Sequence, residues 1–446
     1  MMAPIACDIL LHAGAALLGD DTGCVLRDTA IAVDAGRILE IGPHASLALR
    51  YAPQRRIGSA AHIALPGLIN THNHTPLALV RGRVEDRGFA PAYLAGVPQG
   101  DALSAEEAYL LARLGVYELL RFGTTTLVDF YRHPDALARA AAEAGLRGFI
   151  GGRIMDADTT RLGHGERRHD PVLGRAMLDE TESFLAGWTG RHPLITPALG
   201  PHAADTCSTA LLAEVAALAQ ATGLGVHTHL HQSPGEVEIV QARDGCRPVE
   251  VFDRLGLLGP RLLAGHCIWM QPDDIARVGA SGASVAHAPI GNAAHGAIAP
   301  ALALEAAGAR ISLCTDSKSG DMFEAMRCAV QVARIRGAGF AFGAAQALRW
   351  ATRGGAATLG LDDVGALIPG WRADIVLLDG TMPNLRPLPD GPGLIVHSAN
   401  GGNVDCVLVD GALVLDAGRP CRFDAAEVVA SAQAVAERLW EQAGRA

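Results

Sequence analysis

The stretch IALPGLINTHNH, from Ile63 to His74, is an apolar run that ends in two histidines. Further apolar runs follow along the chain, each ending on a polar residue or a glycine, and helix-like segments separate most of them. Parallel strands buried on both faces read as continuous apolar runs, so eight runs alternating with helices predict a (β/α)8 barrel. The runs are Ile63–His74, Thr124–Phe130, Arg147–Gly152, Leu194–His202, Leu224–His231, Leu262–His266, Ala283–His287 and Arg310–Asp316.

The segments between the runs carry the start and stop signals of helices. Ser104 and Glu107 have the spacing of a capping box, and the apolar-periodic segment that they open stops at Gly123. Ser208 opens a second such segment, which stops at Gly223. These signals predict helices on the outside of the barrel.

The two ends of the chain have a different character, with short β-like runs broken by glycine and aspartate turns. We expect residues 1–65 to form the N-terminal part of a small β-sandwich and residues 66–365 to form the barrel. Residues 366–446 would supply the C-terminal part of the sandwich and a terminal helix. The barrel would thus interrupt the small domain.

Composition excludes several classes of protein. The 446 residues carry 37 Lys and Arg against 47 Asp and Glu, a net charge of −10, and no basic block that would bind phosphates. Neither a signal peptide at the N-terminus nor an apolar run of membrane-spanning length is visible. We therefore expect a cytoplasmic protein that binds neither nucleic acid nor membrane.

The nine cysteines are scattered singly, without a CxxC pair. They indicate reduced packing residues. Cys267 and Cys314 are the two that flank candidate site residues, and we expect both to be inert.

Barrel enzymes place their chemistry at the C-terminal ends of the strands, and here several runs end in histidine. His72 and His74 end the first run; residues i and i+2 of a strand face the same side, so both imidazoles can reach one ion. His229 ends the fifth run, His266 the sixth and Asp316 the eighth. Imidazoles with a carboxylate suit zinc or ferrous iron.

Each of these residues also has a simpler interpretation. A His-x-His pair on a strand is often ordinary sequence, and a lone histidine after an apolar run is often a hydrogen-bonded residue at the edge of the core. The simpler interpretation of Asp316 is a helix N-cap, because a helix-like segment from Met322 to Arg336 follows it. The metal interpretation gains from the coincidence that all five residues end barrel strands.

Several motifs, spread over nearly the whole chain, resemble those of the amidohydrolase superfamily. The similarity is to the branch that contains cytosine/guanine-type deaminases, adenosine-derivative deaminases and triazine hydrolases. The segments are LPGLINTHNH (65–74), FGTTTLVDF (122–130), GPHAADTCS (200–208), VHTHLHQ (226–232), GHC (265–267), VAHAPIGN (285–292), CTDS (314–317), ATRGGAATLGL (351–361) and GWRADIVLLD (370–379).

The resemblance implies a role for individual residues. The ligands of a single ion would be His72, His74, His229 and Asp316, and Asp316 would also relay a proton from water to the leaving group. His266 would lie beside the ion, orienting the water or polarising the substrate. Of His227, His229 and His231, which the alternation places on one strand face, the family pattern selects the middle one.

The resemblance also assigns residues around the substrate. His202 matches a substrate contact of the deaminases, Asn292 and His287 match a loop that lines the pocket, and His231 is a further candidate contact. Arg81 and Arg153 follow barrel strands, where each would bind a carbonyl or carboxylate or simply pair with a surface acid.

Two departures from the family pattern bear on the reaction. Where the deaminases usually carry a glutamate that shuttles a proton to a ring nitrogen, this chain has Gln232, which can orient a substrate but cannot exchange a proton near neutral pH. Either the chemistry does not need that shuttle, or His231 or another group supplies it. The segment Gly88 to Gly100 lacks the tryptophan-containing stretch of adenosine-derivative deaminases, which argues against a nucleoside substrate.

The expected function is hydrolysis of a C–N bond in a small nitrogen heterocycle, most simply deamination of a purine, pterin, pyrimidine or triazine ring. Catalysis would use Asp316, His266 and Gln232 with one divalent ion, Zn²⁺ or alternatively Fe²⁺. In the first alternative, the same metal site dechlorinates a triazine or hydrolyses a urea or carbamate. In the second alternative, the protein is a non-catalytic metal-binding scaffold. By analogy with related enzymes we expect a homo-oligomer, a dimer or larger.

Overall fold

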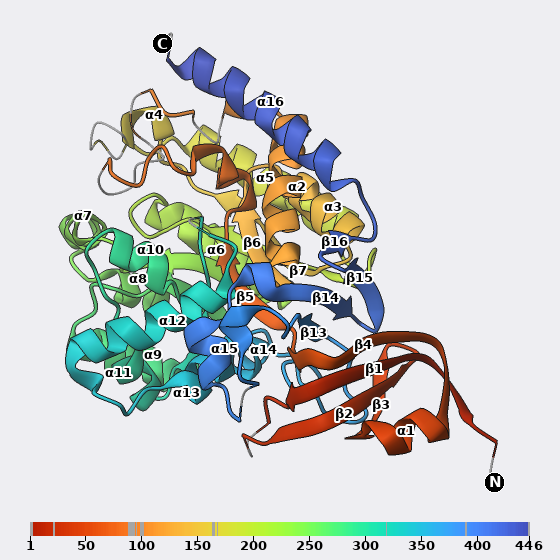
Figure 1. Ribbon diagram of the computed structural model, residues 1–446. Helices are drawn as coiled ribbons and strands as arrows, with labels where there is room; N and C mark the ends of the chain where they lie inside the picture. The colour runs from red at the N-terminus through yellow and green to blue at the C-terminus, as the bar shows by residue number, and fades with distance from the viewer. Residues whose placement is uncertain are drawn as a thin grey trace.

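The computed structural model describes residues 3–20, 23–87, 94, 96–98, 102–162, 166, 168–317, 319–388 and 390–444. Its larger sheet has eight parallel strands in chain order with helices around them (Figure 1), so the predicted barrel is confirmed. The strands are β5 (Leu68–Asn73), β6 (Thr124–Tyr131), β7 (Arg147–Ile154), β8 (Ile195–Pro201), β9 (Val226–Leu230), β10 (Leu262–His266), β11 (Ser284–His287) and β12 (Arg310–Leu313).

The last strand meets the first through the residues that follow it. The Asp316 backbone N–H donates to the His72 carbonyl at 3.1 Å. The Thr315 N–H donates to Oδ1 of Asn70 at 3.1 Å, and the Asn70 amide donates to the Thr315 hydroxyl at 2.8 Å. These bonds fix Asp316 beside the first strand, which carries two of the predicted ligands.

Helices cover the outside of the barrel as predicted. Ser104 and Glu107 form the capping box of α2, and Ser208 caps α6, which ends at Gly223 in a left-handed conformation. The helices of this layer are η1 (Thr75–Val80), α2 (Ala105–Arg121), α3 (Pro134–Ala144), α4 (Thr159–Leu162), α5 (Pro171–Trp188), α6 (Thr209–Thr222), α7 (Pro234–Asp244), α8 (Pro248–Arg254), α9 (Pro272–Ser281), α10 (Pro289–Ala294), α11 (Ala301–Ala306), α12 (Met322–Ala333), the π-helix η4 (Arg334–Ala338), α13 (Ala344–Ala351) and α14 (Arg353–Thr358).

The predicted pairing of the two chain ends is also confirmed: they form one mixed sheet in which β13 lies antiparallel to β4. The strand order is β16-β15-β14-β13-β4-β1-β2-β3. Its strands and the remaining short helix are β1 (Ile5–Leu17), β2 (Val25–Asp34), β3 (Arg37–Pro43), α1 (His44–Arg50), β4 (Tyr51–Pro66), β13 (Ile375–Leu378), β14 (Val404–Val409), β15 (Ala412–Asp416) and β16 (Arg419–Pro420).

The run that opens the barrel is divided between the two sheets at Gly67. Residues Ile63–Pro66 pair with β13 in the small sheet, and the barrel strand begins only at Leu68. A Cβ atom on Gly67 would lie 2.2 Å from the Thr125 hydroxyl oxygen, so only glycine allows this close passage. The apolar pattern is continuous here because both sheets bury these residues.

The C-terminal segment returns to the barrel after leaving the small sheet. η5 (Pro383–Leu385), α15 (Gly393–Ser398) and η6 (Gly401–Asn403) connect β13 to β14, and α16 (Ala425–Ala443) ends the described chain. α16 packs along α2 (Figure 1), where Arg113 pairs with Glu427 at 2.7 Å. The Trp440 indole of α16 donates to the Leu79 carbonyl of η1 at 2.8 Å.

The domain boundaries at residues 65 and 366 stay predictions. Within the described ranges, no helix has both the length and the apolar composition to cross a lipid bilayer.

Candidate metal centre

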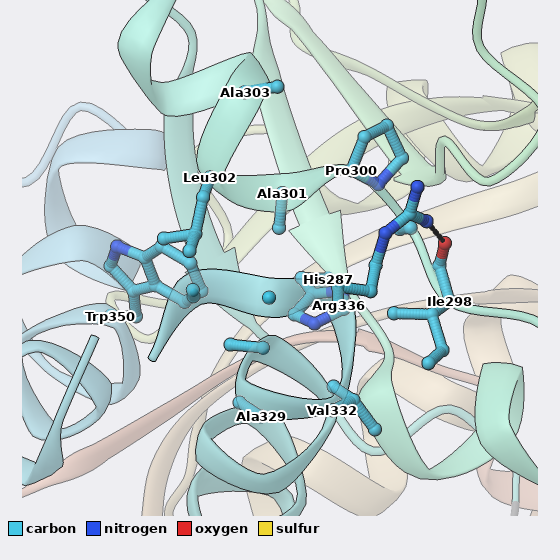
Figure 2. Close-up of a pocket in the computed structure, with 14 residues that line it drawn as sticks. His287, Ile298, Pro300, Ala301, Leu302, Ala303, Ala329, Val332, Arg336 and Trp350 are labelled. Carbon is cyan, nitrogen blue, oxygen red and sulfur yellow. Dashed lines mark hydrogen bonds between the residues drawn. The ribbon is translucent and has the colours of Figure 1, made fainter. Parts of the chain in front are cut away.

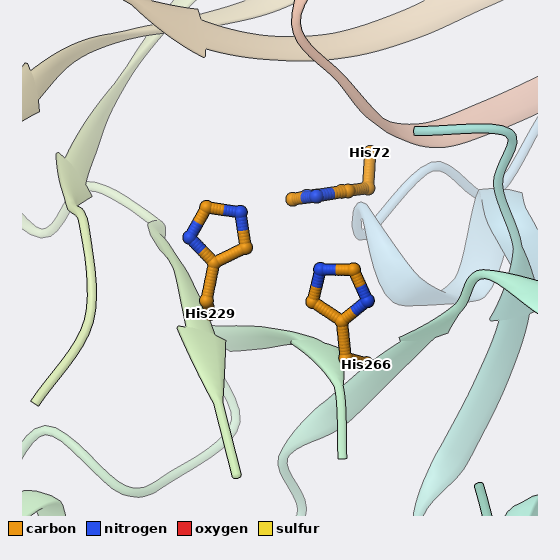
Figure 3. A group of neighbouring side chains, drawn as sticks. All are labelled: His72, His229 and His266. Atoms are coloured by element: carbon orange, nitrogen blue, oxygen red, sulfur yellow. The ribbon is translucent and has the colours of Figure 1, made fainter. Parts of the chain in front are cut away.

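The structure brings the predicted metal-binding residues together at the C-terminal mouth of the barrel. Ligand atoms of His72, His229 and His266 lie within 4.8 Å of one another, as do those of His72, His74 and Asp316. Figure 3 shows the rings of His72, His229 and His266 gathered from their separate strands. Nε2 of His74 lies 3.1 Å from Nε2 of His229.

Asp316 completes the cluster from the end of the last strand. Its Oδ1 lies 3.7 Å from Nε2 of His72 and 3.8 Å from Nε2 of His74. The simpler interpretation as a helix cap does not hold, because the side chain of Asp321, not Asp316, accepts the N–H groups that open α12. Asp316 has φ 58° and His266 has φ 70°, a left-handed conformation that is uncommon for non-glycine residues.

Hydrogen bonds fix the tautomers of the histidines. Nδ1 of His74 donates to the Phe130 carbonyl at 2.9 Å, and Nδ1 of His229 donates to the His202 carbonyl at 2.8 Å. Because a carbonyl only accepts, both Nδ1 atoms carry the proton and both Nε2 atoms present a lone pair to the cluster.

His72 is oriented by another histidine. Its Nδ1 lies 2.8 Å from Nε2 of His227, and both rings are fully buried. Nε2 of His72 has no hydrogen-bond partner in the described structure. A buried polar atom without a partner is costly, and an ion among these ligands would satisfy it.

Burial sets the charge state of the cluster. It lowers the pKa of His72, His227 and His229 well below the usual range, and neighbouring histidines lower it further. Burial also lowers the pKa of His74, partly offset by Asp316. Neutral imidazoles are the form that binds a metal ion, so the cluster is ready for one near neutral pH.

Asn292 lies behind His266 rather than in the cluster itself. On α10, its Oδ1 accepts a hydrogen bond from Nδ1 of His266 at 2.9 Å, and the residue is buried. This bond turns Nε2 of His266 toward the other histidines. Two roles therefore fit this geometry equally well: Asn292 positions His266, or it contacts the substrate as predicted.

His202 lies at the edge of the cluster, with its ring centroid 4.7 Å from that of His229. Its Nδ1 is 2.7 Å from the Thr206 hydroxyl, which fixes the ring. This position is compatible with the predicted contact to a substrate.

His231 is not part of the cluster. The expectation that it shares a strand face with His227 and His229 is wrong, because β9 ends at Leu230 and His231 has φ 51°. Its ring is completely buried between the Trp269 carbonyl, 3.1 Å from Nδ1, and the Val249 N–H, which donates to Nε2 at 3.2 Å. Its predicted contact with substrate has no support from this position, and neither has a role in proton transfer.

Gln232 follows on the same turn. Its side chain is half-buried and makes no hydrogen bond among the described residues. Its backbone N–H donates to the carboxylate of Glu236 at 2.7 Å, as does that of His231 at 3.1 Å. Burial, and secondarily the charge of Asp205, raises the pKa of Glu236 well above its usual range. The Glu236 carboxyl group already accepts the backbone N–H groups of this turn.

Other residues singled out in the sequence fall into place around the centre. Arg153 is buried, 5.0 Å from the centroid of the Tyr131 ring, and its charge lowers the pKa of His74. Arg81 instead forms an ion pair with Glu118 in the helical layer. Cys267 and Cys314 are fully buried, and burial raises the pKa of both thiols, which keeps them unreactive. Most of the segment Gly88–Gly100 lies outside the described residues, so the expectation based on it has no structural counterpart.

Sequence reasoning assigned no role to His227. Its position two residues before His229 on one strand was the available signal, since alternate residues share a face. The bond to His72 across the barrel depends on the neighbouring strands and is not visible in the sequence.

The donor set fits one divalent metal ion: imidazole nitrogens with free lone pairs, a carboxylate, and an orphaned buried nitrogen in the middle. Such a centre at the mouth of a parallel barrel defines a metal-dependent barrel hydrolase. The chain belongs to the amidohydrolase family, whose model it matches over residues 63–414. This family membership confirms the expectation that the chain is a hydrolase acting on C–N bonds.

Comparisons with individual proteins agree with this family. The chain is 33% identical over 441 residues to a 5-methylthioadenosine/S-adenosylhomocysteine deaminase of Pelotomaculum thermopropionicum, covering 97% of this chain and 99% of the relative. A zinc-bound adenosine deaminase from Xanthomonas campestris has the same fold, with a TM-score of 0.87, 29% identity, and coverage of 98% of this chain and 99% of that one. A zinc complex of atrazine chlorohydrolase from Arthrobacter aurescens, with a TM-score of 0.83, 22% identity, and coverage of 96% and 100%, shares the fold.

Proposed function

We propose that this protein is a zinc-dependent deaminase that hydrolyses the exocyclic C–N bond of an aminated ring, with an adenine-type ring as the first candidate. The observation that carries the proposal is the convergence of His72, His74, His229 and Asp316 with their lone pairs turned inward. The relative named as a deaminase of adenosine derivatives, similar over nearly the whole chain, supports the substrate class. It weighs against the expectation, drawn from Gly88–Gly100, that a nucleoside is a less suitable substrate.

His72, His74, His229 and Asp316 would hold the ion. A divalent ion in this place supplies Lewis-acid activation of water, which lowers the pKa of that water toward neutrality. Zinc is favoured over ferrous iron because solved relatives of this fold contain zinc.

The residues around the ion would move protons and stabilise charge. Asp316 accepts a proton from the attacking water and passes it to the leaving amino group. His266, held by Asn292, stabilises the negative charge that develops as water adds to the ring carbon. The ring carbon gains an oxygen and loses ammonia, so water and the amine are consumed while a carbonyl and ammonia form.

A substrate panel tests the proposal. Zinc-loaded protein is incubated with 5′-methylthioadenosine, guanine, a pterin, cytosine and an aminotriazine, and released ammonia is measured. We expect ammonia from at least one aminated ring, stopped by a chelator and restored by zinc. Stoichiometric zinc without turnover on any of these compounds would contradict the proposal.

Gln232 favours a second candidate, dechlorination of a triazine or hydrolysis of a urea or carbamate. Without a residue that protonates the ring, a substrate with a better leaving group becomes more suitable. Chloride or amine release without ammonia from the same panel, extended to a chlorotriazine and a urea, would select this candidate.

We expect Gln232→Glu to raise the rate of ammonia release by up to about 10²-fold, because a carboxylic acid can protonate the ring nitrogen and an amide cannot. The measurement is kcat on the best aminated substrate. Gln220→Glu, which adds the same charge on the exposed face of α6, is the control. An unchanged rate in Gln232→Glu would show that this position transfers no proton and would favour the second candidate.

His227 should matter for metal binding without touching the ion. Replacing it by leucine removes the partner of Nδ1 of His72, and we expect zinc affinity to fall about 10–100-fold, the usual effect of losing a residue that orients a ligand. Competition with a chromophoric chelator measures the affinity. His227→Gln, whose amide oxygen still accepts a hydrogen bond, should restore most of it; wild-type affinity in the leucine variant would refute the role.

A further inference from the structure

A cavity of about 310 Å³ lies outside the barrel, between strand β11 and helices α11, α12 and α13. Its walls are almost entirely apolar, and Figure 2 shows Leu302, Val332 and Trp350 around it. The volume is at the lower end of the range for small-molecule sites. It lies on the helix side of β11, so an occupant here would not compete for the metal centre.

His287 lines the inner part of this cavity. It is the last residue of β11 and only 2% exposed. The side chain of the preceding residue, Ala286, packs in a core cluster with Leu263 and Cys314. Since successive strand residues face opposite sides, His287 points outward to the helices, and the expectation that it lines the catalytic pocket is wrong.

The His287 ring has an unmet hydrogen-bonding capacity. Nδ1 is buried and has no partner in the described part of the chain. Burial lowers the pKa of His287 to about 4, so the ring is neutral at physiological pH. An unpartnered buried polar atom on a residue that lines a cavity is the kind of group that an enclosed water satisfies.

The charge around the cavity has one sign. Arg336, an exposed residue of the π-helix η4, lines the cavity and donates to the Ile298 carbonyl (Figure 2). Among the residues that the structure describes, no acidic side chain lines it. The carboxylate of Glu305, on α11, accepts hydrogen bonds from Arg349 at 2.6 Å and from the Trp350 indole at 2.8 Å.

We propose that this cavity binds a small organic carboxylate with a compact apolar body. The carboxylate pairs with the Arg336 guanidinium, and the body fills the apolar space in front of Trp350 and His287. We choose an anion because the described lining contains one cation, Arg336, and no acid. We choose an apolar body because the walls are apolar. The proposal does not depend on the proposed function.

The test uses 4-fluorobenzoate as the probe, observed by ¹⁹F NMR on the full chain with the metal removed by a chelator. Removing the metal excludes binding of the carboxylate to the ion. We expect saturable binding at millimolar concentration, and markedly weaker binding of the neutral isostere 4-fluorobenzamide.

Two arginines of the same π-helix give a matched pair of variants. Arg336→Met should weaken 4-fluorobenzoate about tenfold or more, because it removes the charge-assisted hydrogen bonds to the carboxylate. Arg334→Met should leave binding unchanged, since Arg334 lies over the Phe340 ring and does not line the cavity. No saturable binding to the metal-free protein, equal binding of the amide, or equal losses in both variants would each overturn the proposal.

Discussion

Asp316→Asn is expected to lower kcat by about 10³-fold, within the range for loss of a general base. Asparagine keeps the shape of the side chain and can still contact an ion through its oxygen, but it cannot accept the proton of the attacking water. The backbone bond from residue 316 to His72 is unaffected, so the barrel should stay closed. The measurement is kcat at saturating zinc, with metal content determined on the same sample.

Asp321→Asn is the matched control for this variant. Asp321 lies on the same connection but caps α12 and accepts the Gly401 N–H at 2.8 Å. Its replacement should reduce stability by about 1 kcal/mol at most, as for other caps, with kcat almost unchanged. Near wild-type turnover in Asp316→Asn would refute the role of Asp316 in proton transfer.

His72→Ala should abolish both zinc binding and turnover. His72 is a ligand candidate in both groups of the cluster, and its Nε2 is the buried nitrogen without a partner. Removing a direct ligand should weaken zinc by more than the roughly 100-fold upper limit for an orienting residue. Metal content after dialysis, measured by mass spectrometry, should fall from one zinc per chain to almost none.

His62→Ala provides the control for loss of a histidine. His62 lies in the small sheet, bonded to Ser59 at 3.0 Å and to Asp405 at 3.2 Å, away from the barrel mouth. It should retain zinc and turnover. If His72→Ala kept a full equivalent of zinc with wild-type affinity, the ion would have to be bound elsewhere.

The barrel and the residues of the metal cluster were predictable because both depend on strand positions. An apolar run that ends in a polar residue marks the mouth of the barrel whatever the details of packing, so His72, His74, His229, His266 and Asp316 could be expected together. The joining of the chain ends was also visible in the β-like pattern of the two termini.

Features that depend on backbone direction after a strand end were not predictable in the same way. His231 has the alternation of a strand residue, but a positive φ turns the chain and buries the ring against Trp269 and Val249. Asp316 and His266 also have a positive φ, yet their side chains lie in the cluster. The sequence pattern therefore does not show which residue after a strand end turns into the cluster and which turns away from it. The contact of His227 with His72 joins two strands that are 155 residues apart in the chain, and the contact of Asn292 with His266 joins helix α10 to strand β10.

The central claim is that one ion lies between His72, His74, His229 and Asp316, and anomalous diffraction at the zinc edge from crystals of the zinc-loaded protein tests it most directly. The account predicts one strong anomalous peak per chain, about 2.0–2.2 Å from the three Nε2 atoms and the carboxylate. An anomalous peak elsewhere, or active crystals with no peak among these residues, would contradict it.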